Sequence, residues 1–542
     1  MDQWVLLGDE AIAQGAIDAG LTCIYAYPGT PSTEINEYVE RSREARERQI
    51  KACWCANEKT AMETAIGVSY TGKRGMACMK HVGLNVAADP FINSAITGAN
   101  GGLLVVSADD PSMHSSQNEQ DSRFYGKFAM VPILEPGNQQ EAYDMTYEGF
   151  NLSERLKLPV LIRITTRLAH SRAVVKRSHP VVEQNPIRLP DNPLQYILLP
   201  VSARKRYKEL LGKQEQVIRE AEESRFNQWI DGTDRSLGII AAGIAYNYLI
   251  ENYNDRKCPH PVVKIGHYPM PRTLIEKLYD SCDQILVLED GYPFIEELLR
   301  GYLNHGKKIM GRMDGTCPLD GELNPAKVAT ALGFAVHTGM PVPGVVISRP
   351  PSLCKGCPHI FSFNALNEAV SSFPKGRVFS DIGCYSLGAL APYQAINSLV
   401  DMGASITMAK GAADAGLIPS IAVIGDSTFI HSGITGLVDA VNNRSPITLI
   451  ILDNQTTAMT GGQPSLASPR IETICEGAGV EKEHIHIVNP IPKNHGINLD
   501  IIRQELEYHG VSVIIPRREC IQTASRKLKQ ARSEKPVKEE IA

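Results

Sequence analysis

Short apolar runs and stretches with helical periodicity alternate along most of the chain. In the first part, apolar runs at residues 21–26 and 101–107 predict buried strands, and residues 58–70 show the spacing of a helix. Asp9 is expected to cap the first helix of this series. Strands that alternate with helices favour a parallel sheet with helices on both faces.

The alternation resumes after a charged stretch at residues 204–225, whose many Lys, Glu and Gln side chains indicate a solvated helix. Prolines in the run 340–351 disfavour a helix and predict an extended tether. The clearest later strands are expected at residues 237–242, 262–265, 284–289, 420–425 and 448–453. The sequence therefore predicts several α/β domains joined by linkers.

These patterns divide the chain into five segments. Residues 1–190, 237–345 and 346–525 are the expected α/β domains, 191–236 form a linker with a helical segment, and 526–542 form a charged, frayed tail. A length of 542 residues agrees with several domains rather than one.

Composition narrows the range of partners and compartments. The formal net charge is −5, so the chain lacks the basic surplus expected of a nucleic-acid-binding surface. No basic region followed by an apolar one opens the sequence, and apolar runs such as 449–452 are far shorter than the ~20 residues that span a bilayer. Twelve cysteines without a secretion signal indicate a reducing, cytoplasmic location, where clustered cysteines bind metals or remain buried thiols.

The strongest chemical signal is Gly425-Asp426-Ser427, then 26 further residues and then Asn454. Both motifs follow predicted strands, and ligands of open α/β sheets bind at the carboxyl ends of strands. A carboxylate oxygen of Asp426, the amide oxygen of Asn454 and a backbone carbonyl near Thr456 suit Mg²⁺, whose coordination diphosphate oxygens and water would complete. Gly425 would let the backbone approach the phosphates. The alternative is an ordinary pair of strand ends with polar residues.

A second signal is the run Cys354-Lys355-Gly356-Cys357-Pro358-His359, with Cys384 27 residues after its second cysteine. The CxxC spacing brings two thiolates within reach of one metal. Three ligands are incomplete, and the candidates for a fourth are Cys475 and Cys520. The alternatives are a zinc site that also uses the histidine of this run, and buried inert thiols.

The residues around these motifs resemble those of one enzyme family. Alpha subunits of indolepyruvate:ferredoxin oxidoreductases are similar to this chain in the runs YPGTPSTEI, NEKTAMETAIGVSYTGKRGMACMKHVGLNVAADP, SADDPSMHSSQNEQDSR, GDSTFIHSGITGLVDAVNN and ILDNQTTAMTGGQPS. The resemblance covers about residues 5–525, with the motifs in the family's order. It implies a multi-domain α/β fold in which two thiamine-diphosphate-binding parallel-sheet domains flank a transketolase-C-terminal-like α/β domain.

The resemblance also assigns roles to individual residues. Glu58, nine residues before Gly67, matches the acid that shares a proton with the aminopyrimidine ring of thiamine; Glu63 is its rival, and a Glu in a helix's first turn can also simply favour the helix dipole. Thr30 is expected to face the 2-oxoacid, and Met459 to support the bent cofactor. The cofactor-binding residues implied on the pyrimidine side are His81 and Asn85, and those near the substrate are His114, Ser115 and Gln117.

Iron–sulfur chemistry follows from the same resemblance. It implies a [4Fe–4S] cluster held by Cys354, Cys357, Cys384 and Cys520, because Cys520 fits the family's late cysteine better than Cys475. The implied reaction is oxidative decarboxylation of a 2-oxoacid, such as the aryl-pyruvate indolepyruvate, to an acyl-CoA with electron transfer to ferredoxin. Thiamine diphosphate, Mg²⁺, coenzyme A, a smaller beta subunit and ferredoxin or another electron-carrier subunit are the expected cofactors and partners.

Two departures from the family pattern stand out. The family's C-terminal ferredoxin-like domain, with CxxCxxCxxxCP runs, has no counterpart after Cys520, so electrons are expected to leave through another subunit or a carrier. The family's GHQP is Gly461-Gly462-Gln463-Pro464 in this chain, which puts the aromatic specificity in question. A non-oxidative thiamine-dependent decarboxylase, which needs no cluster, is the alternative enzyme. A catalytically silent subunit would be expected to lose Asp426 or Glu58, and both are present.

Overall fold

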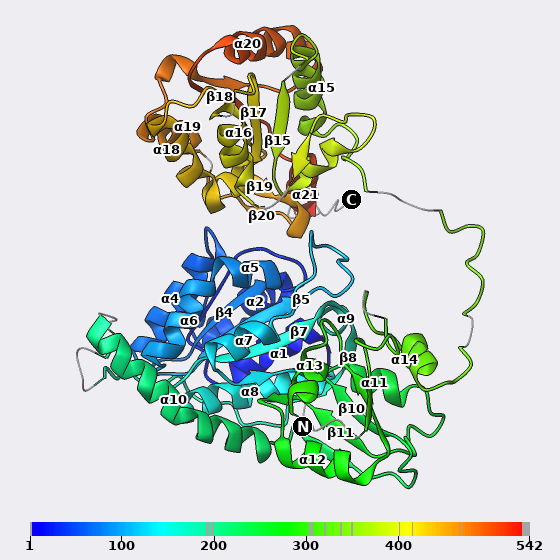
Figure 1. Cartoon of the computed structure of the whole chain (residues 1–542). Helices are drawn as coiled ribbons and strands as arrows, with labels where there is room; N and C mark the ends of the chain where they lie inside the picture. The colour runs from blue at the N-terminus through cyan, green and yellow to red at the C-terminus, as the bar shows by residue number, and fades with distance from the viewer. Residues whose placement is uncertain are drawn as a thin grey trace, which may run out of the picture. The chain divides into compact units, whose positions relative to one another are not determined.

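A computed structural model describes residues 3–190, 195–196, 200–302, 307–318, 321–336, 339–347, 351–374, 376–399, 402–414, 416–467 and 469–533. The chain divides into two compact units, Met1–Pro341 and Val342–Ala542 (Figure 1). Each unit has its own sheets and its own hydrophobic core. The five-segment division of the sequence remains a prediction.

The larger sheet of the first unit is parallel except at one edge. Its strands, in spatial order, are β12 (His267–Tyr268), β6 (Ile133–Leu134), β7 (Val160–Thr165), β5 (Leu103–Asp109), β4 (Gly75–Lys80), β2 (Cys23–Ala26) and β3 (Lys51–Trp54). Only β12 runs antiparallel to its neighbour. The main helices between these strands are α1 (Gly8–Asp18), α2 (Thr33–Arg41), α4 (Glu58–Tyr70), α5 (His81–Val86), α6 (Ala88–Thr97), α7 (Arg123–Ala129), α8 (Gln139–Leu156) and α9 (Thr166–His170).

A second sheet of the same unit has the order β14 (Lys308–Met310), β13 (Gln284–Leu288), β10 (Gly238–Ala242), β11 (Val262–Ile265) and β9 (Gln228–Ile230). Only β9 is antiparallel to its neighbour. Its helices are α10 (Pro200–Glu222), α11 (Ala245–Ile250), α12 (Arg272–Ser281), α13 (Phe294–Tyr302) and α14 (Pro325–Ala331). One hydrophobic cluster contains residues of both sheets, so they form a single core.

Buried ion pairs connect the two sheets of the first unit. The Arg163 guanidinium on β7 donates hydrogen bonds to Asp109 (2.6 Å) and Glu135 (2.5 Å). Arg123 on α7 donates to Glu289 (2.8 Å), which directly follows β13 of the second sheet. Both arginines are fully buried. Because unpaired buried charges are strongly unfavourable, these contacts fix how the two sheets pack.

The second unit contains one fully parallel sheet, with the order β16 (Ser398–Leu399), β15 (Arg377–Ser380), β17 (Ser420–Gly425), β18 (Ile447–Leu452), β22 (Val511–Pro516) and β21 (Ile485–Val488). Alternate residues of β17 belong to opposite cores. Ile421 and Val423 pack with α15 (Pro358–Val370) and α20 (His495–Glu507), whereas Ala422 and Ile424 pack with α16 (Ala404–Asp414) and α18 (Ile434–Asn442) (Figure 1). Helices on both faces explain why these strands are apolar throughout.

The predicted α/β class with parallel sheets is confirmed, and three local predictions need correction. Asp9 does not cap α1, because Leu7 is the N-cap residue and the Glu10 carboxylate accepts the Leu7 N–H at 2.8 Å. The strand that precedes α1, β1 (Gln3–Leu7), was not predicted, and it pairs with β8 (Arg172–Lys176) in a separate antiparallel ribbon. Helix α21 (Ile521–Ser533) replaces the start of the expected frayed tail; residues 534–542 lie outside the described part.

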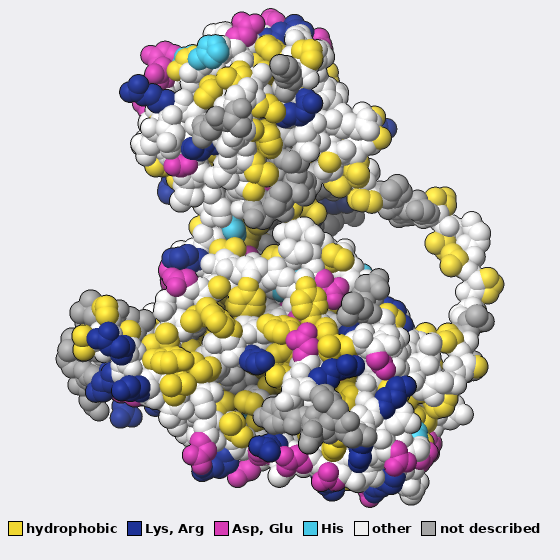
Figure 2. All heavy atoms as spheres, in the orientation of Figure 1, with side chains coloured by type: hydrophobic (Ala, Val, Ile, Leu, Met, Phe, Trp, Pro, Cys, Tyr) yellow, Lys and Arg dark blue, Asp and Glu magenta, His cyan; other side chains and the backbone are white. Residues whose placement is uncertain are grey.

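The predicted tether lacks regular secondary structure where the structure describes it. Residues 339–347 form no helix or strand and are almost all exposed. In the described part of the chain, no helix combines the length and apolar character needed to cross a membrane. On the face drawn in Figure 2, basic and acidic side chains are interspersed outside the grey atoms, without a continuous basic band.

His267 on β12 predicts how stability depends on pH. Burial lowers the pKa of its imidazole to about 4, against an unfolded value of about 6.5. Below pH 6.5, His267 therefore binds a proton in the unfolded chain but stays neutral in the folded chain. The free energy of unfolding falls as the pH drops towards 4, and His267 does not affect it above pH 7. We expect the free energy of unfolding of His267→Gln to fall by about 3 kcal/mol less than that of wild type over this pH range. The measurement is the melting temperature of wild type and variant between pH 7.5 and 4.5. An equal fall of melting temperature with pH in both proteins would contradict the prediction.

Candidate active site

Four neighbouring parallel strands of the first unit, β2, β3, β4 and β5, end at the same edge of the large sheet. The segments that follow them carry Thr30, Glu58, His81 and Ser115, respectively. Residues predicted from separate motifs are thus brought to one edge, where ligands of open α/β sheets bind.

Glu58 is the first residue of α4, and its side chain is almost fully buried. The helix is capped by Asn57, whose side-chain oxygen accepts the Thr60 N–H at 2.8 Å. A Cβ atom added to Gly83 would lie 2.6 Å from Cγ and Oε1 of Glu58, so the carboxyl group rests against the α5 backbone. The rival Glu63 is instead exposed and forms an ion pair with Lys59.

A contact network joins Thr30 to the loop after β5. The Ser115 hydroxyl donates to the Thr30 carbonyl at 3.3 Å, and the Lys80 ammonium donates to the Ser115 carbonyl at 2.8 Å. Burial lowers the pKa of Lys80 to about 8. Lys80 was not among the site residues predicted from the sequence. The available signal was a lysine at the end of a buried strand, directly before His81.

His81 and Asn85 both lie on α5 and contact the same loop. His81 is buried, its Nε2 is 3.1 Å from the Asn118 carbonyl, and its Nδ1 has no hydrogen-bond partner. Asn85 donates to the Gln120 side chain at 2.7 Å. The free ring nitrogen leaves His81 able to bind a ligand, whereas the Asn85 amide is occupied.

The remaining predicted substrate residues are more exposed. His114 forms an ion pair with Glu322 at 3.1 Å, and Glu322 also pairs with Arg167. Gln117 is exposed. The structure therefore places these two side chains on the loop after β5, at its solvent-facing side.

The second unit repeats the arrangement with Asp426 after β17 and Asn454 after β18. The pairing of Gly425 with Leu452 makes the two strand ends neighbours. Asp426 is only 2% exposed, and its Oδ2 has no hydrogen-bond partner. Burial, together with the nearby Asp453 charge, raises the pKa of Asp426 to about 7. A buried carboxylate oxygen without a partner fits a cation ligand.

Asn454 is held by two hydrogen bonds. Its side-chain oxygen accepts the Thr456 N–H at 3.0 Å, and its Nδ2 lies 3.3 Å from Nε2 of His359. Burial lowers the pKa of His359 to about 4, so the neutral ring accepts this bond. His359 therefore orients the predicted Mg²⁺ ligand, a role that its place in the CKGCPH run did not reveal.

Packing gives a further reason for the glycine of the GDS motif, and its approach to phosphates stays a prediction. A Cβ atom on Gly425 would lie 2.6 Å from the ring of Tyr385. Tyr385 is buried, and its hydroxyl donates to the Asp381 carboxylate after β15. The motif's Ser427 accepts a hydrogen bond from the Thr457 hydroxyl at 3.0 Å.

A small hairpin follows Asn454. In it, β19 (Thr456–Thr457) pairs with β20 (Gln463–Pro464). Met459 in the turn is 60% exposed, so core packing does not account for this apolar side chain. Gly462, where the family has histidine, has a φ of +93°, and an added Cβ would lie 2.9 Å from the Arg526 guanidinium. A histidine would be strained in this backbone conformation.

Three cysteines of the predicted cluster lie near enough to the fourth, Cys384, to affect its thiol. Burial raises the pKa of the Cys384 thiol to about 12, and Cys357, Cys520 and Cys354 add to this increase. The Cys520 N–H donates to the Asn454 carbonyl at 3.1 Å, which joins this cysteine to the loop after β18. Cys475, by contrast, is fully buried in α19 (Ile471–Gly477), and the only neighbouring charge that affects its thiol is Glu472.

Zinc geometry is not preformed among these sulfur atoms. Tetrahedral ligands about 2.3 Å from Zn²⁺ would lie about 3.8 Å apart. Across the described residues, the only group of three or more His, Cys, Asp or Glu ligands within 4.8 Å of one another lies in the first unit. No three of the four cysteine sulfur atoms are therefore that close to one another.

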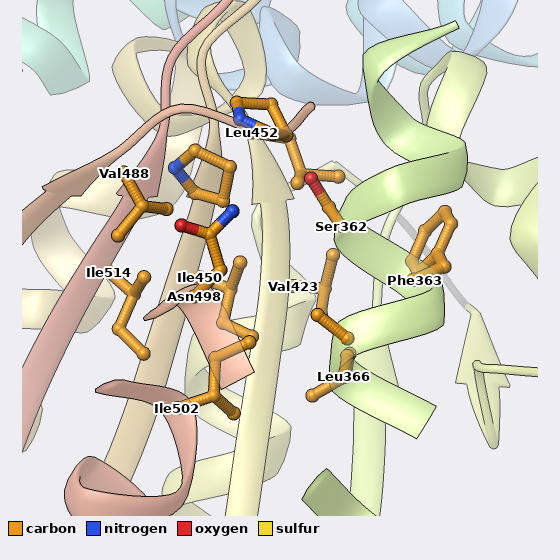
Figure 3. Close-up of a pocket in the computed structure, with 13 residues that line it drawn as sticks. Ser362, Phe363, Leu366, Val423, Ile450, Leu452, Val488, Asn498, Ile502 and Ile514 are labelled. Atoms are coloured by element: carbon orange, nitrogen blue, oxygen red, sulfur yellow. The ribbon is translucent and has the colours of Figure 1, made fainter. Parts of the chain in front are cut away.

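Two cavities of the structure are lined by other residues than these. Figure 3 shows a gap between α15, β17, β18 and β22 that is lined by apolar side chains such as Phe363 and Ile450. Its volume of about 10 Å³ holds at most one water molecule. In the first unit, a cavity of about 300 Å³ is lined by α7, α10, α12 and α13, without any predicted site residue.

Comparison with known proteins relates each of the two units to a thiamine-diphosphate-binding family. Residues 14–197 match the family model "Pyruvate flavodoxin/ferredoxin oxidoreductase, thiamine diP-bdg", and residues 381–536 match "Thiamine pyrophosphate enzyme, C-terminal TPP binding domain". Indolepyruvate oxidoreductase subunit IorA of Archaeoglobus fulgidus is 40% identical over 95% of this chain and 86% of its own length. The Thermococcus kodakarensis subunit is 36% identical over 95% and 85%.

The chain belongs to the indolepyruvate oxidoreductase alpha-subunit family. Membership confirms the predicted family and the prediction of a thiamine-diphosphate-dependent enzyme of the 2-oxoacid oxidoreductase type. Among solved structures, 2-oxoglutarate:ferredoxin oxidoreductase from Magnetococcus marinus is similar in fold, with a TM-score of 0.51 and 17% identity. That match covers 61% of this chain and 65% of the other.

Proposed function

We propose that this chain catalyses the oxidative decarboxylation of an aryl-pyruvate, such as indolepyruvate, to an acyl-CoA. A [4Fe–4S] cluster, if held by this chain's cysteines, would supply the path for electrons to ferredoxin or another electron-carrier subunit, and a smaller beta subunit would complete the enzyme. The observation that carries the proposal is the convergence of Asp426, Asn454, Cys384 and Cys520 at one edge of a parallel sheet. The relatives named indolepyruvate oxidoreductase support the choice of substrate.

Thiamine diphosphate, when bound, supplies a nucleophilic carbon that adds to the ketone of the 2-oxoacid and takes up the electron pair released with CO₂. Asp426, Asn454 and the Thr456 carbonyl would hold Mg²⁺ against the diphosphate, and the partnerless Oδ2 of Asp426 supports this assignment. His359 keeps the Asn454 oxygen directed away from its own ring, because that ring accepts from the Asn454 amide nitrogen.

On the pyrimidine side, Glu58 would exchange a proton with the ring nitrogen of the cofactor. Its burial against Gly83 supports this role over Glu63, which is exposed and paired with lysine. Thr30, with Ser115 behind it and Lys80 bonded to Ser115, would present a hydroxyl and a positive charge to the carboxylate of the substrate.

Single electrons need a nearby acceptor, which a [4Fe–4S] cluster on Cys354, Cys357, Cys384 and Cys520 would supply. Cys357 is the N-cap residue of α15; burial raises the pKa of its thiol to about 11, and hydrogen bonds from the backbone of His359 and Ile360 only partly oppose this increase. A non-oxidative decarboxylase would have no use for these four cysteines, so their proximity favours the oxidoreductase.

Asp426→Ala tests the metal site. We expect it to abolish Mg²⁺-dependent binding of thiamine diphosphate in calorimetry, because the principal carboxylate ligand is lost. Asp439→Ala, which removes an exposed carboxylate of the same unit, is the matched control and should bind normally. Unchanged affinity in Asp426→Ala would place the metal elsewhere.

Glu58→Gln tests the proton exchange while keeping the size of the side chain. Turnover should fall by ~10²–10⁴-fold with the cofactor still bound. Exchange of the C2 proton of bound thiamine, followed by NMR, should slow to match, and Glu63→Gln should exchange at the wild-type rate. If Glu58→Gln exchanges normally, another residue handles this proton.

Cysteine variants test the cluster and, with it, the oxidative reaction. Anaerobically purified protein should contain about four iron and four sulfide per chain. Cys520→Ala should lower both contents, whereas Cys475→Ala, which removes a thiol away from the group, should keep them. Iron retained in Cys520→Ala but lost in Cys475→Ala refutes the ligand set, and a chain without iron refutes the oxidoreductase mechanism.

A further inference from the structure

Asp9 is in an unusual state for a buried acid. It lies in the first turn of α1 and is fully buried, yet neither carboxylate oxygen has a hydrogen-bond partner. Leu7, and not Asp9, is the N-cap residue of this helix, and its N–H is bonded to Glu10. Because burial of an unpaired carboxylate is costly, Asp9 needs either a proton or a cation beside it.

Two further metal-ligating side chains face Asp9. Glu34 in the first turn of α2 and His170 at the end of α9 each place one ligand atom within 4.8 Å of the other two groups. Nε2 of His170 is 3.5 Å from Oε2 of Glu34. Asp9 lies on the buried side of this group. The His170 side chain is 35% exposed and is accessible to solvent.

The backbone is shaped to bring these groups together. A Cβ atom on Gly8 would lie only 2.3 Å from the Leu168 carbonyl oxygen, so glycine alone permits this approach of α1 to α9. That approach sets Asp9 beside His170, two residues beyond Leu168. The cluster is thus fixed by close packing of helices and is not a chance gathering of surface acids.

We propose that Asp9, Glu34 and His170 bind one divalent transition-metal cation of the Mn²⁺ or Zn²⁺ type. Two carboxylates neutralise the charge of such an ion, and an imidazole nitrogen favours a transition metal over Mg²⁺ or Ca²⁺. Water ligands complete the coordination from the His170 side. The donor set contains no residue of the Asp426 site.

The ion would act as a clamp between three helices. It joins α1, α2 and α9, and α2 begins directly after the loop that carries Thr30. That loop is already tied to α2, because the Thr33 hydroxyl accepts the Gly29 N–H at 3.2 Å. Binding of the cation would therefore stabilise the helix start that supports the Thr30 loop.

Counting bound Mn²⁺ tests the site in the full-length chain with thiamine diphosphate present. Loss of the free-ion signal in room-temperature EPR gives the number bound. Asp9→Asn should bind one Mn²⁺ fewer than wild type, and Asp426→Ala should lose a different ion, so that the double variant loses two. His179→Ala, which disrupts another His–carboxylate pair of the first unit, should bind as wild type does. Failure of this inference and failure of the Asp426 site are thereby separated.

A second variant keeps the test decisive if Asp9→Asn folds poorly. His170 is partly exposed, so His170→Ala leaves the core intact and should weaken Mn²⁺ binding at this site at least about tenfold. Mn²⁺ should also raise the melting temperature of wild type more than that of either variant. Equal Mn²⁺ counts and equal melting shifts in wild type, Asp9→Asn and His170→Ala would overturn the proposal.

Discussion

The parallel pairing of β15, β17, β18 and β22 is the constraint on which the candidate site depends. Each strand delivers the residues after it to the same edge of the sheet, so Cys384, Asp426, Asn454 and Cys520 converge although they span 137 residues of sequence. The helices on both faces cannot cover this edge, which leaves it free for ligands. The first unit uses the same geometry for Thr30, Glu58, His81 and Ser115.

Buried charge is handled in two different ways. Where it supports the fold, buried carboxylates are bonded to cationic or hydroxyl partners, as with Arg163 between Asp109 and Glu135 and with Tyr385 beside Asp381. Asp426 and Asp9 instead retain oxygens without partners. Since a buried anion needs compensation, the contrast separates carboxylates that the fold satisfies from those that an incoming cation can satisfy. The proposed Mg²⁺ site and the proposed Asp9 site rest on the same electrostatic argument.

Contacts between residues far apart in sequence explain several of the glycines. A side chain at Gly83 would clash with Glu58, and one at Gly425 would clash with the Tyr385 ring. Gly462 has a positive φ beside the Arg526 guanidinium, where a histidine would be strained. In each case the glycine is visible in the sequence, but the side chain that it contacts lies on another element. Only the folded structure therefore shows why a glycine stands there.

By itself, the sequence determined the alternation of strands and helices, the family, the GDS-to-Asn spacing and the CxxC. These features are local, because they depend on periodicity and on short motifs. Tertiary structure decided what depends on pairing between distant segments. Cys520 rather than Cys475 lies near Cys384, His359 is bonded to Asn454, and Lys80 is bonded to Ser115. Asp9 is a buried acid whose oxygens lack hydrogen-bond partners, and it is not a helix cap. Burial and contacts across strands arise only when segments far apart in sequence pack together, and no local pattern encodes them.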